Sequence, residues 1–345
     1  MNNKWQNAVR SMEQRMESLR LNMHGYQILY RGELIGEHYW ESFHRDSLHR
    51  MYSITKSFTS LATGLLAAEG KLGLDDRICT YFPEKLPEGG AHPWCEEMTI
   101  RDLLTMRTCY ESTTFKRYDG DWVESFFRVT PDHVPGTVFN YDTSASHVLA
   151  ALVEKLTGMD MLDYLRKKVL RRVGFSEEAY ILKDPYGVIQ GGSGLVSKLS
   201  DLAGIAMLCC RGGVLDGEQL IPADFLREAT ACQVPTNLQP TTFHTVFSFA
   251  ASTGSQRRCH SHHQYCCPYF SVPFAHSYRL LLISAFFKPE PFEIKIASRQ
   301  ENEGHILLSR HSFQRETQFP IFLAVREGKY LCSSIGKPKL DRILL

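Results

Sequence analysis

Hydrophobic and polar positions follow a helix period first and a strand period next. Apolar residues recur at three- and four-residue steps over residues 5–20, which predicts an amphipathic helix that covers one face of a sheet. Gly25–Tyr30 and Glu33–Trp40 look like two strands around Arg31-Gly32, a pattern that predicts a hairpin. The pattern therefore places a small sheet ahead of the remaining chain.

A long apolar helix is predicted directly after this hairpin. It begins near Ser53, its inward positions run from Phe58 to Ala68, and Gly70 ends it. Helical signals then dominate from about Leu72 to Thr230, and each predicted helix has a capping Ser or Thr, an early Pro or a closing Gly. These helices are Thr99–Leu104, Ser144–Leu156, Asp160–Val173, Ser200–Cys210 and Pro222 to about Cys232.

The start of the long helix carries candidate chemistry. Ser53 and Lys56 are three residues apart, so a helix starting near Ser53 brings the hydroxyl and the amine to one face. A serine needs a base nearby to act as a nucleophile, and a lysine amine serves where burial or a neighbouring cation favours its neutral form. The alternative is a helix-capping serine beside a solvated lysine, and the short Ser-x-x-Lys spacing alone does not separate the two.

Six motifs that follow one another along the chain strengthen the interpretation of Ser53 and Lys56. They are Met51–Phe58, Leu72–Asp76 with Tyr81-Phe82-Pro83, Thr99–Thr108, Pro135–Gly158, Gly191–Asp201, and Gly212-Gly213 with Leu220-Ile221-Pro222. Together they resemble the serine beta-lactamase-related hydrolases, a family that includes class C beta-lactamases, D-Ala-D-Ala carboxypeptidases, esterases and amidases. The resemblance implies an α/β (α+β) fold of the beta-lactamase/transpeptidase type. In that fold the N- and C-terminal segments form an antiparallel sheet, with a helical domain inserted between them.

The resemblance also implies the roles of three residues. Ser53 is the acylated nucleophile, Lys56 is its partner, and Tyr141 is the phenol that takes the serine proton and later returns one to the leaving group. A half-buried aromatic with its hydroxyl bonded to backbone is the alternative for Tyr141. Many relatives have Tyr-x-Asn at this point, whereas this chain has Tyr141-Asp142-Thr143, so any substrate contact of that amide is in doubt. The glycine-rich stretch Gly191–Leu195 lacks a Lys-Ser/Thr end, which favours tight backbone packing over a phosphate loop.

The resemblance runs from about Gly25 to Cys232, and the chain departs from the family after Thr230. The Lys- or His-x-Gly motif that completes such a site is not evident, and Ser252-Thr253-Gly254 and His276 are only weak candidates for it. The Cys259–Cys267 cluster is a weaker candidate for a zinc site, because it has thiol and imidazole ligands but lacks their usual paired spacing. We therefore predict a hydrolase domain over residues 1–235, with its hairpin at about 25–40 and helical part at about 72–232. Residues 236–345 are an atypical segment, with the abrupt change of character that a shifted reading frame would produce.

Two expectations follow for this segment. If it cannot supply strands, the hairpin keeps an open edge, and protease cuts first between about Pro235 and Pro291. If it can, Leu280–Ile283 and Ile321–Val325 pair as strands of the missing sheet, because both are apolar runs of strand length.

Composition limits the function classes. Hydrophobic residues make up 43% and charged residues 22% of the 345 residues, and the formal net charge is +1. These values are typical of a globular protein and give no global field for nucleic acid or a membrane. No secretory signal or membrane-spanning run is evident, so we expect a cytoplasmic protein. The sequence therefore predicts a serine hydrolase that needs no cofactor or metal and acts on a small ester, amide or beta-lactam-like substrate. The alternative is a non-catalytic member of the same fold that binds a ligand or partner.

Overall fold

The computed structural model describes most of the N-terminal two thirds and several strands of the C-terminal third. The described residues are 3–18, 23–30, 32–231, 233–234, 278–287, 293–294, 308–309, 319–326 and 329–331. Ser252-Thr253-Gly254, His276 and the Cys259–Cys267 cluster lie outside them, so their interpretations stay predictions.

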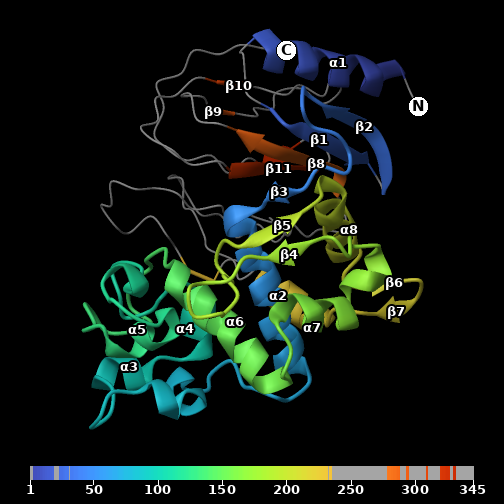
Figure 1. Cartoon of the computed structure of the whole chain (residues 1–345). Helices are drawn as coiled ribbons and strands as arrows, with labels where there is room; N and C mark the ends of the chain where they lie inside the picture. The colour runs from blue at the N-terminus through green and yellow to red at the C-terminus, as the bar shows by residue number, and fades with distance from the viewer. Residues whose placement is uncertain are drawn as a thin grey trace.

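Strands from both ends of the chain form a five-stranded sheet in the order β12-β11-β8-β1-β2 (Figure 1). The bounds are β1 Gly25–Tyr30, β2 Glu33–Tyr39, β8 Tyr278–Phe287, β11 Phe319–Arg326 and β12 Lys329–Leu331. All its pairs are antiparallel. The predicted hairpin is confirmed as β1 and β2, with Gly32 at φ +89° in its turn, a value that favours glycine. A sheet shared by the two ends of the chain is what the resemblance implied.

The expectation of an open edge at β1 is wrong. The strand β8 pairs along all of β1, from Gly25 opposite Ala285 to Tyr30 opposite Leu280. The strand β11 continues the sheet with Phe322 opposite Ile283. The alternative prediction, that Leu280–Ile283 and Ile321–Val325 pair, is thereby confirmed. Its physical reason is that two apolar runs of strand length satisfy the backbone groups that β1 would otherwise leave unpaired.

Helices cover both faces of this sheet. The helix α1 (Asn3–Ser18) lies on one side, and α8 (Leu199–Cys210) lies on the other (Figure 1). The Tyr26 hydroxyl of β1 donates a hydrogen bond of 2.5 Å to Glu13 of α1. A side chain at Gly36 would stand 3.3 Å from Val9, so the glycine lets α1 approach β2 closely. The first predicted helix therefore covers the sheet as expected. Within the described ranges, the helices are all too short or too polar to cross a membrane.

The inserted part is mostly helical. Its helices are α2 Thr55–Ala68, α3 Pro93–Glu97, α4 Ile100–Leu104, α5 Trp122–Arg128, α6 Thr143–Thr157, α7 Met161–Lys168 and α9 Ala223–Ala229. The remaining short strands are β3 His49–Arg50, β4 Tyr180–Ile181, β5 Leu195–Ser197, β6 Val214–Leu215, β7 Glu218–Gln219, β9 Glu293–Ile294 and β10 Leu308–Ser309. The strand β5 pairs with both β3 and β4 and ties the hairpin region to the helices.

Most predicted caps are confirmed and three boundaries are corrected. Thr99 and Asp102 form a reciprocal capping box, and Gly158 closes α6 in the left-handed conformation. The predicted helix Asp160–Val173 divides into α7 and a 3-10 turn at Leu170–Val173. Ser200 does not cap α8, because the helix begins at Leu199 and Asp201 accepts from the amide of Lys198. The helix that follows Pro222 ends at Ala229 rather than near Cys232.

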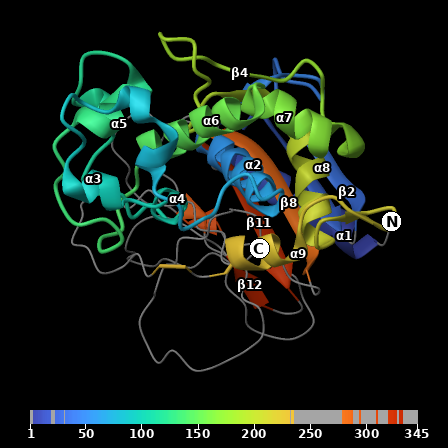
Figure 2. The same cartoon turned by 90° about the horizontal axis from the view of Figure 1, so that it is seen from below.

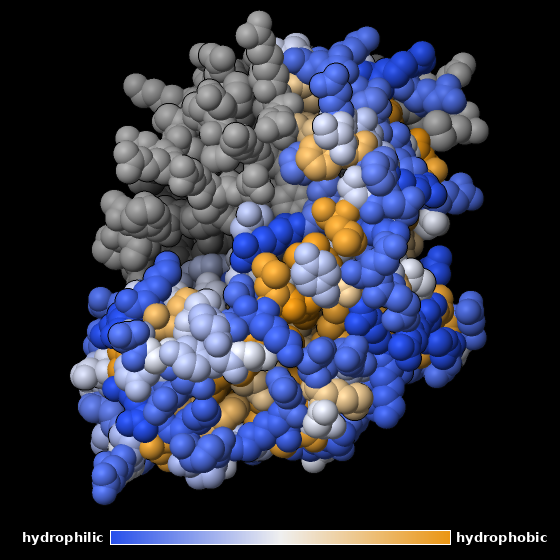
Figure 3. Space-filling model, in the orientation of Figure 1, coloured by the Kyte–Doolittle hydropathy of each residue, from blue (hydrophilic) through white to orange (hydrophobic). Residues whose placement is uncertain are grey.

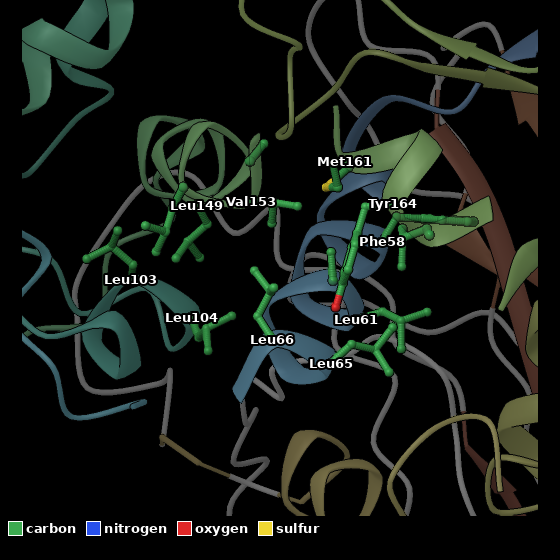
Figure 4. Packing of buried hydrophobic residues seen from close by; sticks show 14 of the residues in the cluster. Phe58, Leu61, Leu65, Leu66, Leu103, Leu104, Leu149, Val153, Met161 and Tyr164 are labelled. Atoms are coloured by element: carbon green, nitrogen blue, oxygen red, sulfur yellow. The ribbon is translucent and has the colours of Figure 1, made fainter. Parts of the chain in front are cut away.

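The helix α2 occupies the middle of the core, with α6 and α7 on one side of it and α9 on the other (Figure 2). Figure 4 shows its apolar side chains meeting those of α4, α6 and α7. The labelled residues are Phe58, Leu61, Leu65, Leu66, Leu103, Leu104, Leu149, Val153, Met161 and Tyr164, and all are buried. Close packing of this kind holds the start of α2 in a fixed position. Lys56 lies in the first turn of α2, and Ser53 lies in the short turn that leads into it.

Candidate active site

Ser53 lies in a 3-10 turn, Tyr52–Ile54, that leads into α2. Two hydrogen bonds attach the turn to β5: the Met51 amide donates to the Leu195 carbonyl at 2.6 Å, and the Leu195 amide donates to the Thr55 hydroxyl at 3.0 Å. The same hydroxyl donates to the Tyr52 carbonyl at 2.6 Å. Tyr52 has φ +43°, a left-handed conformation that is costly for a residue with a side chain. The backbone before Ser53 is therefore held in a strained turn by its surroundings.

Lys56 stands at the centre of the site. Its Nζ donates to Ser53 Oγ at 3.2 Å, to the Gly192 carbonyl at 2.6 Å and to Thr143 Oγ1 at 3.4 Å. It also lies 4.8 Å from the centroid of the Tyr141 ring. These three acceptors match the three donors of an ammonium, and one of them is the predicted nucleophile. The structure thus brings Tyr141, from the motif Pro135–Gly158, beside Ser53 and Lys56, from the motif Met51–Phe58.

Tyr141 directly precedes α6. Among the described residues its hydroxyl has no hydrogen-bond partner, so the alternative of a phenol tied to backbone finds no support there. Its neighbour Asn140 donates to the Tyr110 carbonyl at 2.9 Å and anchors this segment instead.

The two residues after Tyr141 explain what replaces the missing asparagine. Asp142 is the N-cap of α6 and accepts from the Ser144 amide at 2.8 Å. Burial raises the pKa of the Asp142 carboxyl, which is closed off from solvent. Thr143 takes the contact to Lys56 through its hydroxyl. The chain therefore keeps a polar atom beside the lysine but supplies one hydroxyl in place of an amide.

The glycine-rich turn at residues 190–194, named here the 190–194 turn, completes the surroundings of Lys56. A Cβ at Gly191 would lie 2.3 Å from Ala150 Cβ, and one at Gly192 would lie 2.4 Å from Thr143 Cγ2. Only glycine lets this turn approach α6 so closely, which confirms the prediction of tight backbone packing. The turn presents the Gly191 carbonyl to Thr59 at 2.7 Å and the Gly192 carbonyl to Lys56.

Thr143 and Gly192 are contacts of the site that the sequence did not reveal. The adjacent glycines were a signal of close packing, but a carbonyl acceptor leaves no trace in a sequence.

The molecular surface over β3, β4 and β5 carries an apolar area within a mostly hydrophilic face (Figure 3). Within the described part of the chain, no three His, Cys, Asp or Glu side chains lie close enough together to hold a metal ion.

Comparisons with known proteins agree with this geometry. A family model described as beta-lactamase matches residues 10–242. The chain is 23% identical over 237 residues to the 6-aminohexanoate-dimer hydrolase of Paenarthrobacter ureafaciens, an alignment that covers 64% of this chain and 59% of that protein. It is 28% identical over 166 residues to protein flp of Staphylococcus aureus, covering 44% of this chain and 33% of that protein. The chain thus spans about a third to three fifths of these relatives.

Solved structures share the fold. EstCE1, described as a hydrolase with promiscuous acyltransferase activity, superposes with a TM-score of 0.53 at 16% identity, covering 66% of this chain and 77% of that one. The octameric penicillin-binding protein homologue of Pyrococcus abyssi superposes with a TM-score of 0.51 at 20% identity, covering 67% of this chain and 61% of that one. The architecture is therefore the beta-lactamase/transpeptidase-like α/β fold. With a family model matched over most of its length, this chain belongs to the beta-lactamase family.

Proposed function

We propose that this protein is a serine hydrolase that cleaves a small ester, amide or beta-lactam-like substrate through a covalent acyl-enzyme on Ser53. The observation that carries the proposal is the 3.2 Å contact between Lys56 Nζ and Ser53 Oγ, beside the ring of Tyr141. A hydroxyl needs a proton acceptor within hydrogen-bond reach to become a nucleophile, and Lys56 Nζ lies at the limit of that reach before a substrate binds. It accepts the proton only as the neutral amine, so the Lys56 and Tyr141 pair must hold one proton fewer than an ammonium and a phenol together.

The reaction runs in two steps. Ser53 Oγ forms a bond to the substrate carbonyl carbon while its proton passes to the Lys56 and Tyr141 pair. The bond to the leaving alcohol or amine then breaks, and the pair returns that proton to it. Water next attacks the acyl carbon, gives a proton to the same pair and releases the acid, and the proton returns to Ser53. Every proton that is taken is returned, so the reaction consumes one water molecule and needs no oxidant or reductant.

The surroundings of Lys56 suit this work because they fix its position. The Gly192 carbonyl and the Thr143 hydroxyl hold the amine on two sides while the third donor faces Ser53. A positioned group contributes more to rate than a mobile one, since the ordering entropy is lost on folding rather than in the transition state. The names of the relatives fit an amide or ester as the bond cleaved, and the substrate itself stays unassigned.

Covalent labelling tests the proposal. The protein is incubated with a fluorophosphonate or a penicillin and its intact mass is measured, followed by peptide mapping. We expect one adduct on Ser53 that disappears in Ser53→Ala. Ser60→Ala is the matched control, because Ser60 lies on α2, the helix that follows Ser53, is buried, and its hydroxyl has no hydrogen-bond partner among the described residues. A well-folded protein that takes no adduct would instead support the non-catalytic alternative, which rests on the missing Lys- or His-x-Gly motif and on Thr143 in place of asparagine.

A further inference from the structure

A buried histidine and a buried aspartate lie next to the elements that surround Lys56, namely α6 and the 190–194 turn. His147 Nε2 and Asp184 Oδ2 are 3.0 Å apart, and the two side chains are 2% and 0% exposed. His147 stands one helical turn after Thr143 on α6, and Asp184 opens the loop that leads into the 190–194 turn. Neither residue contacts Ser53, Lys56 or Tyr141 directly in the described structure, so the reaction above does not use them.

Asp184 organises the loop in which it lies. Its Oδ1 accepts from the amides of Tyr186 and Val188, each at 2.9 Å, and its own amide donates to the Val188 carbonyl at 2.7 Å. Burial raises the pKa of the Asp184 carboxyl, but hydrogen bonds from His147 and the two amides outweigh burial and hold that pKa below its ordinary value. An ionised carboxylate only accepts hydrogen bonds, so His147 Nε2 carries the proton and donates it.

Backbone hydrogen bonds fix the loop between Asp184 and the 190–194 turn. Ile189 and Lys183 form a β-bridge, and the Gln190 amide donates to the Leu182 carbonyl at 2.7 Å. The next two residues, Gly191 and Gly192, are the ones that pack against α6 and present their carbonyls to Thr59 and Lys56. One side of the 190–194 turn is therefore fixed by the glycine contacts with α6, and the loop before it is fixed to α6 by His147.

Water cannot easily replace the bond between these two side chains. The rings of Trp122 and Phe115 stand edge-on to the imidazole, with centroids 5.5 and 6.2 Å away. The second ring nitrogen, Nδ1, is buried and has no partner among the described residues. A buried polar group that loses its partner stays unsatisfied, so breaking the bond favours movement of the loop away from α6.

We propose that His147 and Asp184 are positioning residues that hold the 190–194 turn against α6, so that the Gly192 carbonyl keeps the amine of Lys56 beside Ser53. The role rests on the proposed function, in which Lys56 moves protons. The effect of His147 and Asp184 on the position of Lys56 does not depend on that function, and it can be measured without any turnover.

Chemical acetylation of Lys56 tests this effect. The full chain carrying Ser53→Ala is treated with a trace of acetic anhydride, and mass spectrometry gives the rate of acetylation at Lys56 relative to the exposed Lys167. His147→Leu removes the donor to Asp184. We expect it to raise the relative rate at Lys56 about fivefold, the factor that corresponds to losing one ordinary hydrogen bond. His147→Gln can still donate to Asp184, and we expect it to return the rate to that of the parent.

Asp201→Asn is the matched control. Asp201 is also buried and also accepts from two backbone amides, those of Ser176 and Lys198, but neither amide belongs to the 190–194 turn or to the loop before it. It should lower the melting temperature without changing the relative rate at Lys56. If His147→Leu does not fold, His147→Asn replaces it, because the shorter amide leaves Asp184 without its donor yet keeps a polar group.

The outcomes are distinct. A raised rate in the Leu or Asn variant that Gln restores supports the positioning role. An unchanged rate in a folded variant, or an equal rise in Asp201→Asn, overturns it. Failure of the proposed hydrolase would show separately, as a protein with an intact Ser53 that takes no adduct, and would leave the acetylation result as it stands.

Discussion

A single methyl group at Gly192 should separate Lys56 from its carbonyl partner. In Gly192→Ala the new Cβ would stand 2.4 Å from Thr143 Cγ2 and 3.0 Å from the Thr143 carbonyl oxygen. Ordinary contact begins near 3.4 Å, so the two groups must separate by about 1 Å. If the turn retreats, the 2.6 Å bond from Lys56 Nζ lengthens to about 3.6 Å, which is no longer a hydrogen bond. If Thr143 rotates instead, Lys56 loses the hydroxyl.

The expected cost follows from these distances. Overpacking of this size costs about 1–3 kcal/mol, a loss of a few degrees in melting temperature. A misplacement of about 1 Å at a catalytic group can cost about 10²-fold in rate, so labelling of Ser53 should slow far more than stability falls. The assays are thermal melting and the rate of fluorophosphonate labelling.

Gly36→Ala is the control, because its Cβ would meet side chains only, at 3.3 Å, on the far side of the sheet. Labelling of Gly192→Ala at the rate of the unmodified protein would refute the reasoning.

Two further predictions concern stability. Burial raises the pKa of Glu69, but hydrogen bonds from Lys168, Lys71 and Tyr164 outweigh it and lower that pKa to about 2. Glu69→Gln should therefore reduce the free energy of unfolding by about 1 kcal/mol above pH 5, and the difference should vanish as the pH falls towards 2. A constant difference in melting temperature across that range would contradict this. Leu282→Pro should lower the melting temperature sharply, because Leu282 pairs with Ile28 on one side and Leu323 on the other, and proline removes a donor from a central strand. An unchanged melt would show that β8 does not pair there.

Local signals predicted local structure well and long-range contacts poorly. The Thr99 cap, the Gly158 stop and the hairpin were readable because each depends on a few neighbouring residues. The pairing of β8 with β1 joins residues more than two hundred positions apart, and apolar runs of strand length indicate that such strands exist without choosing between pairing and an open edge.

The contacts of the candidate site also divide into local ones that the sequence predicted and long-range ones that it did not. Ser53 and Lys56 are neighbours on one turn, so their spacing predicted their contact, and the family resemblance added Tyr141. The Gly192 carbonyl and the bond between His147 and Asp184 depend on how a loop folds back onto α6. Their chemistry involves a backbone group and two residue types that are common in many other roles, so no pattern in the sequence marks them.

Pre-steady-state turnover of a nitrophenyl ester tests the central claim most directly. If Ser53 forms an acyl-enzyme, mixing should release a burst of nitrophenol close to one equivalent per protein chain, followed by slower saturable turnover. Both phases should be lost in Ser53→Ala and kept in Ser60→Ala. Release of nitrophenol at equal rates by the unmodified protein and Ser53→Ala, with no burst in either, would contradict the account.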